Sequence, residues 1–229
     1  MDISQLIQNI SIMALPILFA ITFHEAAHGY MANRLGDPTA RHMGRLTLNP
    51  IAHIDPIGTI LLPLFMLFTT GGRFVFGYAK PVPVNSMNFK NPERDMAIVA
   101  ASGPGINIIL AVLSAILFRI IVYLNPAGFG EEGLLSTILL PVSLMLIKSV
   151  HINVLLAVFN MIPIPPLDGG RVLIGMLPRD LSYSYSRIEP YGILILMALL
   201  FFDPFRTLSR IMGPIISFFV NIILGVTAL

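Results

Sequence analysis

Residues 3–28 read ISQLIQNISIMALPILFAITFHEAAH. The first 21 of them, Ile3–Phe23, carry no charged side chain, and a helix needs about 20 such residues to cross the hydrocarbon core of a bilayer. A cleaved signal peptide has a shorter apolar core, of about 7–15 residues, preceded by a basic residue, whereas this chain has Asp2 at that place. The sequence therefore predicts a first transmembrane helix over about residues 3–33.

The composition of the whole chain agrees with a membrane protein. Of its 229 residues, 55% are hydrophobic and 11% are charged, and the mean hydropathy is +0.83; an average soluble domain has about 25% charged residues. This composition excludes a soluble enzyme and a disordered protein, because too little polar surface is available. The formal net charge of +2 is too small to indicate a nucleic-acid partner. The apolar composition indicates instead that the chain resides in the lipid bilayer.

Further apolar runs predict the rest of the fold. Additional helices are expected over about residues 96–124, 134–161, 188–202 and 208–228. Segment 56–72 is a shorter apolar run with Pro63 inside it. No internal repeat is visible. We expect an all-α polytopic membrane protein, a single domain over residues 1–229, with about five to six transmembrane helices.

Basic side chains orient these helices. They gather in segments 34–45, 73–94 and 171–187, whereas loop 125–133 holds two glutamates and no lysine or arginine. Because cytoplasmic loops carry the excess of basic residues, we expect the three basic segments in the cytoplasm and a multi-pass protein of the cell membrane. Segment 56–72 then cannot cross once, which predicts a re-entrant element. The alternative is a short tilted span that places segment 73–94 outside.

An extended arm is predicted after this element. Phe74–Val84 reads FVFGYAKPVPV, and its aromatic and β-branched residues favour extended backbone. Pro81 and Pro83 fit an edge strand better than a central one. A surface loop is the alternative. A short β-like arm of this kind could pair with an unwound substrate by strand addition.

The end of the first predicted helix carries side chains that can bind a metal ion and transfer a proton. His24 and His28 are four residues apart, which places both imidazoles on one helix face, and Glu25 adjoins the first. This H-E-x-x-H pattern is typical of zinc hydrolases, with the glutamate as general base, and zinc suits a chain without cysteine. The alternative is a coincidental match of interfacial polar residues, but ionisable groups in membrane spans are costly and functional as a rule. The site should face the cytoplasmic side, where this helix ends.

A catalytic zinc takes three protein ligands and keeps one open position, so a third ligand is required. His42 lies among basic loop residues, and His53 precedes the apolar segment 56–72. His151 lies within an apolar helix, where a packing hydrogen bond is the simpler role. Asp168 is therefore the preferred candidate among the remaining residues.

Asp168 lies in the stretch NMIPIPPLDGGR, residues 160–171. The three prolines must end the preceding helix. Irregular backbone at membrane depth is tolerated only where it is buried in protein or lines a wet cavity, which is what an intramembrane site needs. The alternative for Asp168 is an N-cap of a short helix through Leu177; beside the histidine pair, we favour a ligand.

The two motifs together resemble the site-2 protease family of intramembrane zinc metalloproteases, and in particular its compact prokaryotic members. The stretches SGPGIN (102–107) and AKPVPV (79–84) add to the resemblance. The resemblance implies that Zn²⁺ is held by His24, His28 and Asp168. It also implies that Glu25 is the catalytic base.

The same resemblance implies roles for two asparagines. Asn107 and Asn160 would help to position the substrate or the reacting oxygen. For Asn107 a hydrogen bond that joins two helices is an equal alternative. The chain has no segment of the length of the PDZ or CBS domains that larger members carry.

Two functions fit these residues. The first is hydrolysis of peptide bonds in membrane-spanning protein substrates, that is, regulated intramembrane proteolysis. The second is a metal-ion or proton transporter that uses the same cluster of histidine, glutamate and aspartate. Transporters usually show repeated halves, which favours the protease for this sequence.

Overall fold

The computed structural model describes residues 3–70, 77–125, 134–201 and 207–225, and every regular element in these residues is helical. The expected all-α class is confirmed. The α-helices are α1 (Ile3–Leu35), α2 (Thr39–His42), α3 (Leu62–Thr70), α4 (Pro92–Leu124), α5 (Leu134–Asn160), α6 (Asp168–Met176), α7 (Arg179–Ser186), α8 (Gly192–Phe201) and α9 (Thr207–Leu224). Short 3₁₀ turns lie at Pro50–His53, Ser86–Asn88 and Glu189–Tyr191, and a π-helical turn lies at Pro56–Leu61.

Three helices of the described chain are long and apolar enough to cross a membrane: Ile7–Leu35, Pro92–Leu124 and Thr137–Asn160. Their outer faces expose large apolar side chains, such as Phe19 and Leu117, as expected of surfaces that contact lipid. The later helices are shorter, with 10 residues in α8 and 18 in α9. The structure thus supplies three spans, and the count of five to six stays a prediction.

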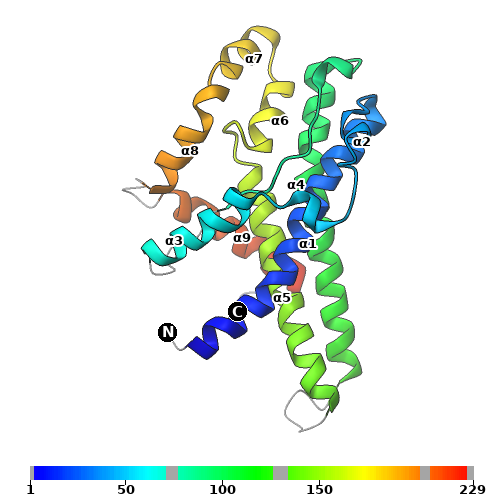
Figure 1. Cartoon of the computed structure of the whole chain (residues 1–229), viewed down its shortest axis with the longest axis vertical. Helices are drawn as coiled ribbons and strands as arrows, with labels where there is room; N and C mark the ends of the chain where they lie inside the picture. Colours follow the sequence, from blue (N-terminus) through cyan, green and yellow to red (C-terminus); the bar gives the residue numbers. More distant parts are fainter. Residues whose placement is uncertain (1–2, 71–76, 126–133, 202–206, 226–229) are drawn as a thin grey trace.

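The bundle is organised around α4, which packs against α1, α5 and α6 (Figure 1). Its small residues allow the neighbouring helices to approach closely, as is usual in membranes. The main core cluster joins α4, α5 and α9 and consists of Ala111, Ala115, Val150, Val154 and Val220. α4 is thus the common neighbour of α1, α5 and α6.

The basic segments gather at one end of the bundle. Figure 1 shows α2, α6, α7 and the start of α4 at the upper end, whereas α4 ends and α5 begins at the lower end. Segments 34–45 and 171–187 therefore share one end of the molecule. This arrangement agrees with the expectation that these two segments lie on the same side of the membrane.

The carboxylate of Asp37 ties this upper end together directly after α1. It accepts hydrogen bonds from Thr39 (backbone N 3.1 Å, Oγ1 2.5 Å), from the backbone N of Asn85 (2.7 Å) and from Nδ2 of Asn88 (2.7 Å). Burial raises the pKa of Asp37, but these hydrogen bonds outweigh burial and hold the pKa below its usual value. The segment that leads into α4 is thereby fastened to the end of α1.

The apolar segment before the arm folds as a π-helical turn continued by α3. Asp55 caps it by accepting hydrogen bonds from the backbone N of Ile57 (3.0 Å) and of Gly58 (2.7 Å). The apolar helix covers Pro56–Thr69, about 21 Å at 1.5 Å per residue, which is shorter than a hydrocarbon core of about 30 Å. Figure 1 shows α3 leaving the bundle sideways at mid-height. These features support re-entry, which stays a prediction.

The described part of the arm, residues 77–84, forms no strand, so the edge strand is not found there; residues 74–76 lie outside the described residues. Its backbone nevertheless donates at every second residue, the periodicity of extended chain. Tyr78 N donates to Gly58 O and Lys80 N to His53 O, both at 3.0 Å. The arm is thus hydrogen-bonded to the two helical turns that precede α3, Pro50–His53 and Pro56–Leu61, and not to another strand.

Candidate metal centre

Three of the predicted residues meet at one point inside the bundle. His24 and His28 lie one turn apart on α1, and Asp168 is the first residue of α6. The two Nε2 atoms are 3.1 Å apart, and Oδ2 of Asp168 is 3.2 Å from Nε2 of His24 and 3.4 Å from that of His28. In the part of the chain that the structure describes, this is the one group of three His, Asp or Glu side chains placed to hold a metal.

The chain between α5 and α6 brings Asp168 to the histidines. The prolines after Asn160 end α5, and the backbone then folds tightly onto itself. A Cβ on Gly169 would collide with the backbone of Met161, and one on Gly170 with the backbone of Pro165. Only glycine fits this close approach, so the two glycines allow α6 to begin at Asp168. The N-cap residue of α6 is Leu167, one residue before Asp168, so the N-cap alternative for Asp168 is not what the structure shows.

Both imidazoles have their Nδ1 atoms occupied. Nδ1 of His28 is 2.8 Å from the carbonyl oxygen of Val99, and Nδ1 of His24 is 2.6 Å from Oδ1 of Asn107. A carbonyl can only accept, so Nδ1 of His28 must donate. The Nδ2 of Asn107 donates to Ala20 O, which leaves its Oδ1 to accept from Nδ1 of His24. In the neutral imidazoles, both Nε2 atoms therefore present lone pairs.

The donor set fits a zinc ion. Two Nε2 lone pairs and a carboxylate oxygen face one another at 3.1–3.4 Å, and no hydrogen-bond donor satisfies the buried Oδ2 of Asp168. Three electron-rich atoms in such proximity repel one another, and a cation between them would stabilise the arrangement. Two imidazoles and one carboxylate are an established ligand set of catalytic zinc, with the fourth position left open.

Gly103 of α4 lies against this centre. A Cβ built on it would be 2.5 Å from Cε1 and Nε2 of His28 and 2.7 Å from Cε1 of His24. Without a side chain at this position, α4 packs directly against the imidazole pair. α4 therefore forms a wall of the centre without a side chain.

Glu25 lies next to the centre and outside the group of three ligands. Its Oε2 accepts a hydrogen bond of 2.9 Å from the backbone N of Val82 in the arm. Oε1 remains for a proton-transfer partner. The sequence did not predict this contact, because a backbone N–H 57 residues away leaves no signal in the residue pattern.

The other predicted residues lie outside the group. Asn160 ends α5, and its Nδ2 donates to Leu156 O of the same helix at 3.0 Å. His151 is exposed and bonds to Ile147 O, and His53 is buried and bonds to Thr47 O. The structure therefore brings neither histidine to the candidate centre.

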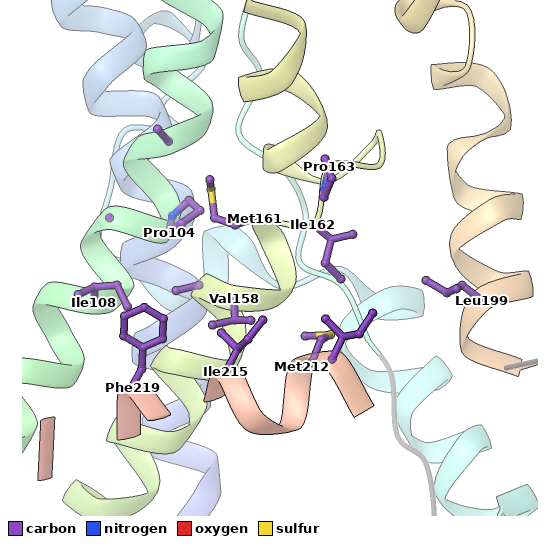
Figure 2. A pocket seen from close by; sticks show the side chains of 14 residues that line it. Pro104, Ile108, Val158, Met161, Ile162, Pro163, Leu199, Met212, Ile215 and Phe219 are labelled. Carbon is purple, nitrogen blue, oxygen red and sulfur yellow. The ribbon is translucent and has the colours of Figure 1, made fainter. Parts of the chain in front are cut away.

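An apolar pocket of about 760 Å³ adjoins the SGPG stretch. Figure 2 shows side chains from α4, the end of α5, α8 and α9 pointing into it. Pro104 and Gly105 line it from α4, and Ile162 and Pro163 line it from the break before α6. Two of the segments that line this pocket, α4 and the break before α6, thus also adjoin the metal centre.

Known proteins are similar to this sequence. Residues 136–202 match Peptidase family M50. The chain is 35% identical over 187 residues to "Putative zinc metalloprotease YwhC" of Bacillus subtilis (strain 168), an alignment that covers 82% of this chain and 78% of that protein. It is 29% identical over 189 residues to "Putative zinc metalloprotease Rip2" of Mycolicibacterium smegmatis, covering 80% of this chain and 64% of that protein. No solved structure gave a significant match.

The family decides between the two functions that the sequence left open. A peptidase family with zinc metalloprotease relatives supports the hydrolase and not the transporter. It also supports zinc as the metal, in agreement with the two imidazoles and the carboxylate that meet at the centre. The chain belongs to peptidase family M50 and is a membrane zinc metalloprotease.

Proposed function

We propose that this metalloprotease hydrolyses peptide bonds in the transmembrane segments of other proteins. The proposal assigns His24, His28 and Asp168 as zinc ligands and Glu25 as general base. The observation that carries it is the meeting of three ligand atoms, all within 4.8 Å of one another, between helices that are long and apolar enough to span a membrane.

The reaction needs a base beside the metal. When bound, zinc supplies Lewis acidity, which polarises a carbonyl and makes water acidic enough to react near neutral pH. Glu25 takes the proton from the attacking water and delivers it to the leaving amine. The Val82 N–H fixes one carboxylate oxygen of Glu25, so that the other oxygen carries the proton. This arrangement orients the base without a second charged group.

The two asparagines receive different roles. Asn107 is fully buried and its amide is bonded to His24, so it orients a ligand and does not touch the substrate. Asn160 is partly exposed at the broken end of α5 and binds its own helix through Nδ2 alone. Its Oδ1 is therefore available to a backbone N–H of the substrate.

The apolar pocket supports a membrane-embedded substrate. Its lining is almost wholly apolar, and it adjoins the break that carries Asp168. A transmembrane segment of the substrate would place apolar side chains in it, because such side chains need no polar partner. Gly103 lies against the imidazoles, whereas the next two residues of α4, Pro104 and Gly105, line the pocket, so the pocket and the centre adjoin the same turn of α4.

The arm supports the handling of an unwound segment. Tyr78, Lys80 and Val82 direct their N–H groups inward. The other edge has Pro81 and Pro83, which carry no N–H, so its backbone offers mainly carbonyl acceptors, of which Pro81 O already accepts one hydrogen bond of 3.4 Å from Nη2 of Arg45. An unwound helix exposes N–H groups that cost several kcal/mol each in lipid, and this edge can accept them.

The position of the basic segments supports an active site on the cytoplasmic side of the membrane. We place the centre toward the cytoplasm of a cell-membrane protein, because the helix ends near segments 34–45 and 171–187 share one end of the bundle (Figure 1) and basic loops stay inside.

The test is made on purified protein in liposomes with a reporter that carries one transmembrane segment. Glu25→Gln keeps an oxygen for the Val82 N–H, so zinc content should stay near one per chain while cleavage is lost. His24→Ala and Asp168→Ala should lose zinc and cleavage together. Retained cleavage by Glu25→Gln would refute the base. If the wild type cleaves only soluble peptides, the membrane substrate is wrong.

A further inference from the structure

Asn153 is a buried amide in the membrane-spanning helix α5 to which no role has been given. Its side chain is 1% exposed and that of Asn107 is 0% exposed. Oδ1 of Asn153 accepts a hydrogen bond of 2.8 Å from Nδ2 of Asn107. Its own Nδ2 donates to Ser149 O at 2.9 Å and is 3.2 Å from Ser149 Oγ. A continuous hydrogen-bonded chain thus runs from α5 through α4 to the imidazole of His24.

The direction of this chain is fixed from its far end. Ser149 O is a carbonyl and can only accept, so the nitrogen of Asn153 must face it and the oxygen must face α4. The nitrogen of Asn107 then faces Asn153, and it also donates to Ala20 O at 3.2 Å. The oxygen of Asn107 is left for Nδ1 of His24. Each amide has one orientation in which all these groups are paired.

The orientation matters for the metal. If Asn107 turned over, its NH₂ would face Nδ1 of His24, which would have to become the acceptor. The proton would then sit on Nε2, and that nitrogen could bind no metal. In water such a turn is cheap, but inside a membrane bundle the unpaired groups have no water to replace their partners.

We propose that Asn153 is a positioning residue that fixes the tautomer of His24 through Asn107, and so keeps Nε2 of His24 ready to bind zinc. The inference rests on the proposed role of His24 as a ligand. Partners that orient a metal-bound histidine in this way commonly change metal affinity about 10–100-fold when they are removed.

The main measurement is zinc affinity of the full chain in detergent, by competition with a chromophoric chelator. Asn153→Leu keeps the size of the side chain and removes its oxygen, and zinc should bind about 10–100-fold more weakly. Ser143→Ala is the matched control: Ser143 is also buried on α5, and its Oγ has no partner among the described residues. That variant should bind zinc as the wild type does.

A double-mutant cycle separates positioning from general damage. If Asn153 acts through Asn107, adding Asn153→Leu to Asn107→Leu should weaken zinc binding no further. Asn153→Asp should rescue, because a buried neutral carboxylic acid still donates toward Ser149 and still accepts from Asn107. The absorption spectrum of the Co²⁺-loaded protein should change in Asn153→Leu and return in Asn153→Asp.

The outcomes are distinguishable. Independent losses in the cycle, or wild-type zinc affinity in a folded Asn153→Leu variant, overturn the inference. If Asn153→Leu fails to fold, Asn153→Asp decides, because weak zinc binding in that folded variant also overturns it. If His24→Ala itself binds zinc normally, the ligand assignment of the proposed function fails instead.

Discussion

Gly103→Ala is predicted to damage the metal centre while adding a single methyl group. The added Cβ would lie 2.5 Å from Cε1 and Nε2 of His28 and 2.7 Å from Cε1 of His24. Ordinary contacts between such atoms are about 3.5–4.0 Å. One or both imidazoles, or α4 itself, must therefore move by about 1 Å, several times the tolerance of about 0.2 Å for a zinc–ligand distance.

This displacement sets the expected magnitude. We expect zinc to bind about 10–100-fold more weakly, which is about 1.4–2.7 kcal/mol. Cleavage should fall on the order of 100-fold even when zinc is saturating, because a misplacement of about 1 Å at the reacting centre costs that much. The substitution also favours the helix by about 1 kcal/mol, since glycine is a poor helix former.

Gly105→Ala is the matched control. It lies two residues further along the same helix, and a Cβ built there would meet no heavy atom within 4 Å. Both variants gain the same helix propensity, so their difference reports the contact with the imidazoles. Zinc affinity by chelator competition and thermal unfolding with and without zinc would be compared between the two variants, and reporter cleavage by Gly103→Ala would be compared with the wild type, because Gly105 also lines the apolar pocket. If a folded Gly103→Ala protein binds zinc and cleaves as the wild type does, the close packing deduced here is wrong.

Three further predictions concern other parts of the molecule. The chain has no cysteine, so single cysteines placed at the exposed positions Arg41 and Lys90 can be labelled with a membrane-impermeant reagent. Both cysteines should react only from the cytoplasmic side. Labelling of the cysteine at position 90 from outside would contradict re-entry of segment 56–72. The lowered pKa of Asp37 predicts that its ionised carboxylate stabilises the folded protein above about pH 4, and that this stabilisation is lost as the pH falls through the pKa of the folded state. Lowering the pH should therefore reduce the unfolding temperature of the wild type more steeply than that of Asp37→Asn. Gly105→Leu should fill the apolar pocket and slow cleavage of a transmembrane reporter more than cleavage of a soluble peptide. Gly213→Leu is the control, because a side chain there also has space, with no atom within 4 Å of a Cβ, but lies outside the pocket lining; it should slow neither reaction. Equal effects of the two substitutions on the transmembrane reporter would show that the substrate does not occupy the pocket.

The local parts of the site could be predicted from the sequence. The spacing of His24 and His28 places them on one helix face by geometry alone. The prolines before Asp168 had to break α5, and a carboxylate beside such a break was a reasonable third ligand. These inferences needed only a helix period and the rules for irregular backbone in lipid.

The long-range parts could not be predicted in the same way. Asn107 stayed between two roles because the choice depends on the register of α4 against α1, which no local pattern sets. The sequence shows Asn153 as a polar residue in an apolar span, but it does not show that the hydrogen-bond partner of Asn153 is Asn107 on α4. The arm was expected to be β-like from its composition. Its inward N–H groups instead donate to the carbonyl oxygens of Gly58 and His53 and to the carboxylate of Glu25, so no β-ladder with a second strand forms.

The height of the histidines along α1 bears on the fate of a cleaved protein. Seven residues follow His28 before α1 ends at Leu35, about 10 Å of helix, whereas 17 residues of the span from Ile7 precede His24, about 26 Å. A bond cut at this height divides a membrane segment unequally. If the centre cuts transmembrane substrates near the cytoplasmic end of the bundle, as proposed, the cytoplasmic piece would keep an apolar stub far shorter than the roughly 20 residues that anchor a helix and would leave the membrane. The outer piece would keep enough apolar residues to stay in the bilayer, so the position of the two histidines along α1 would decide which product is released.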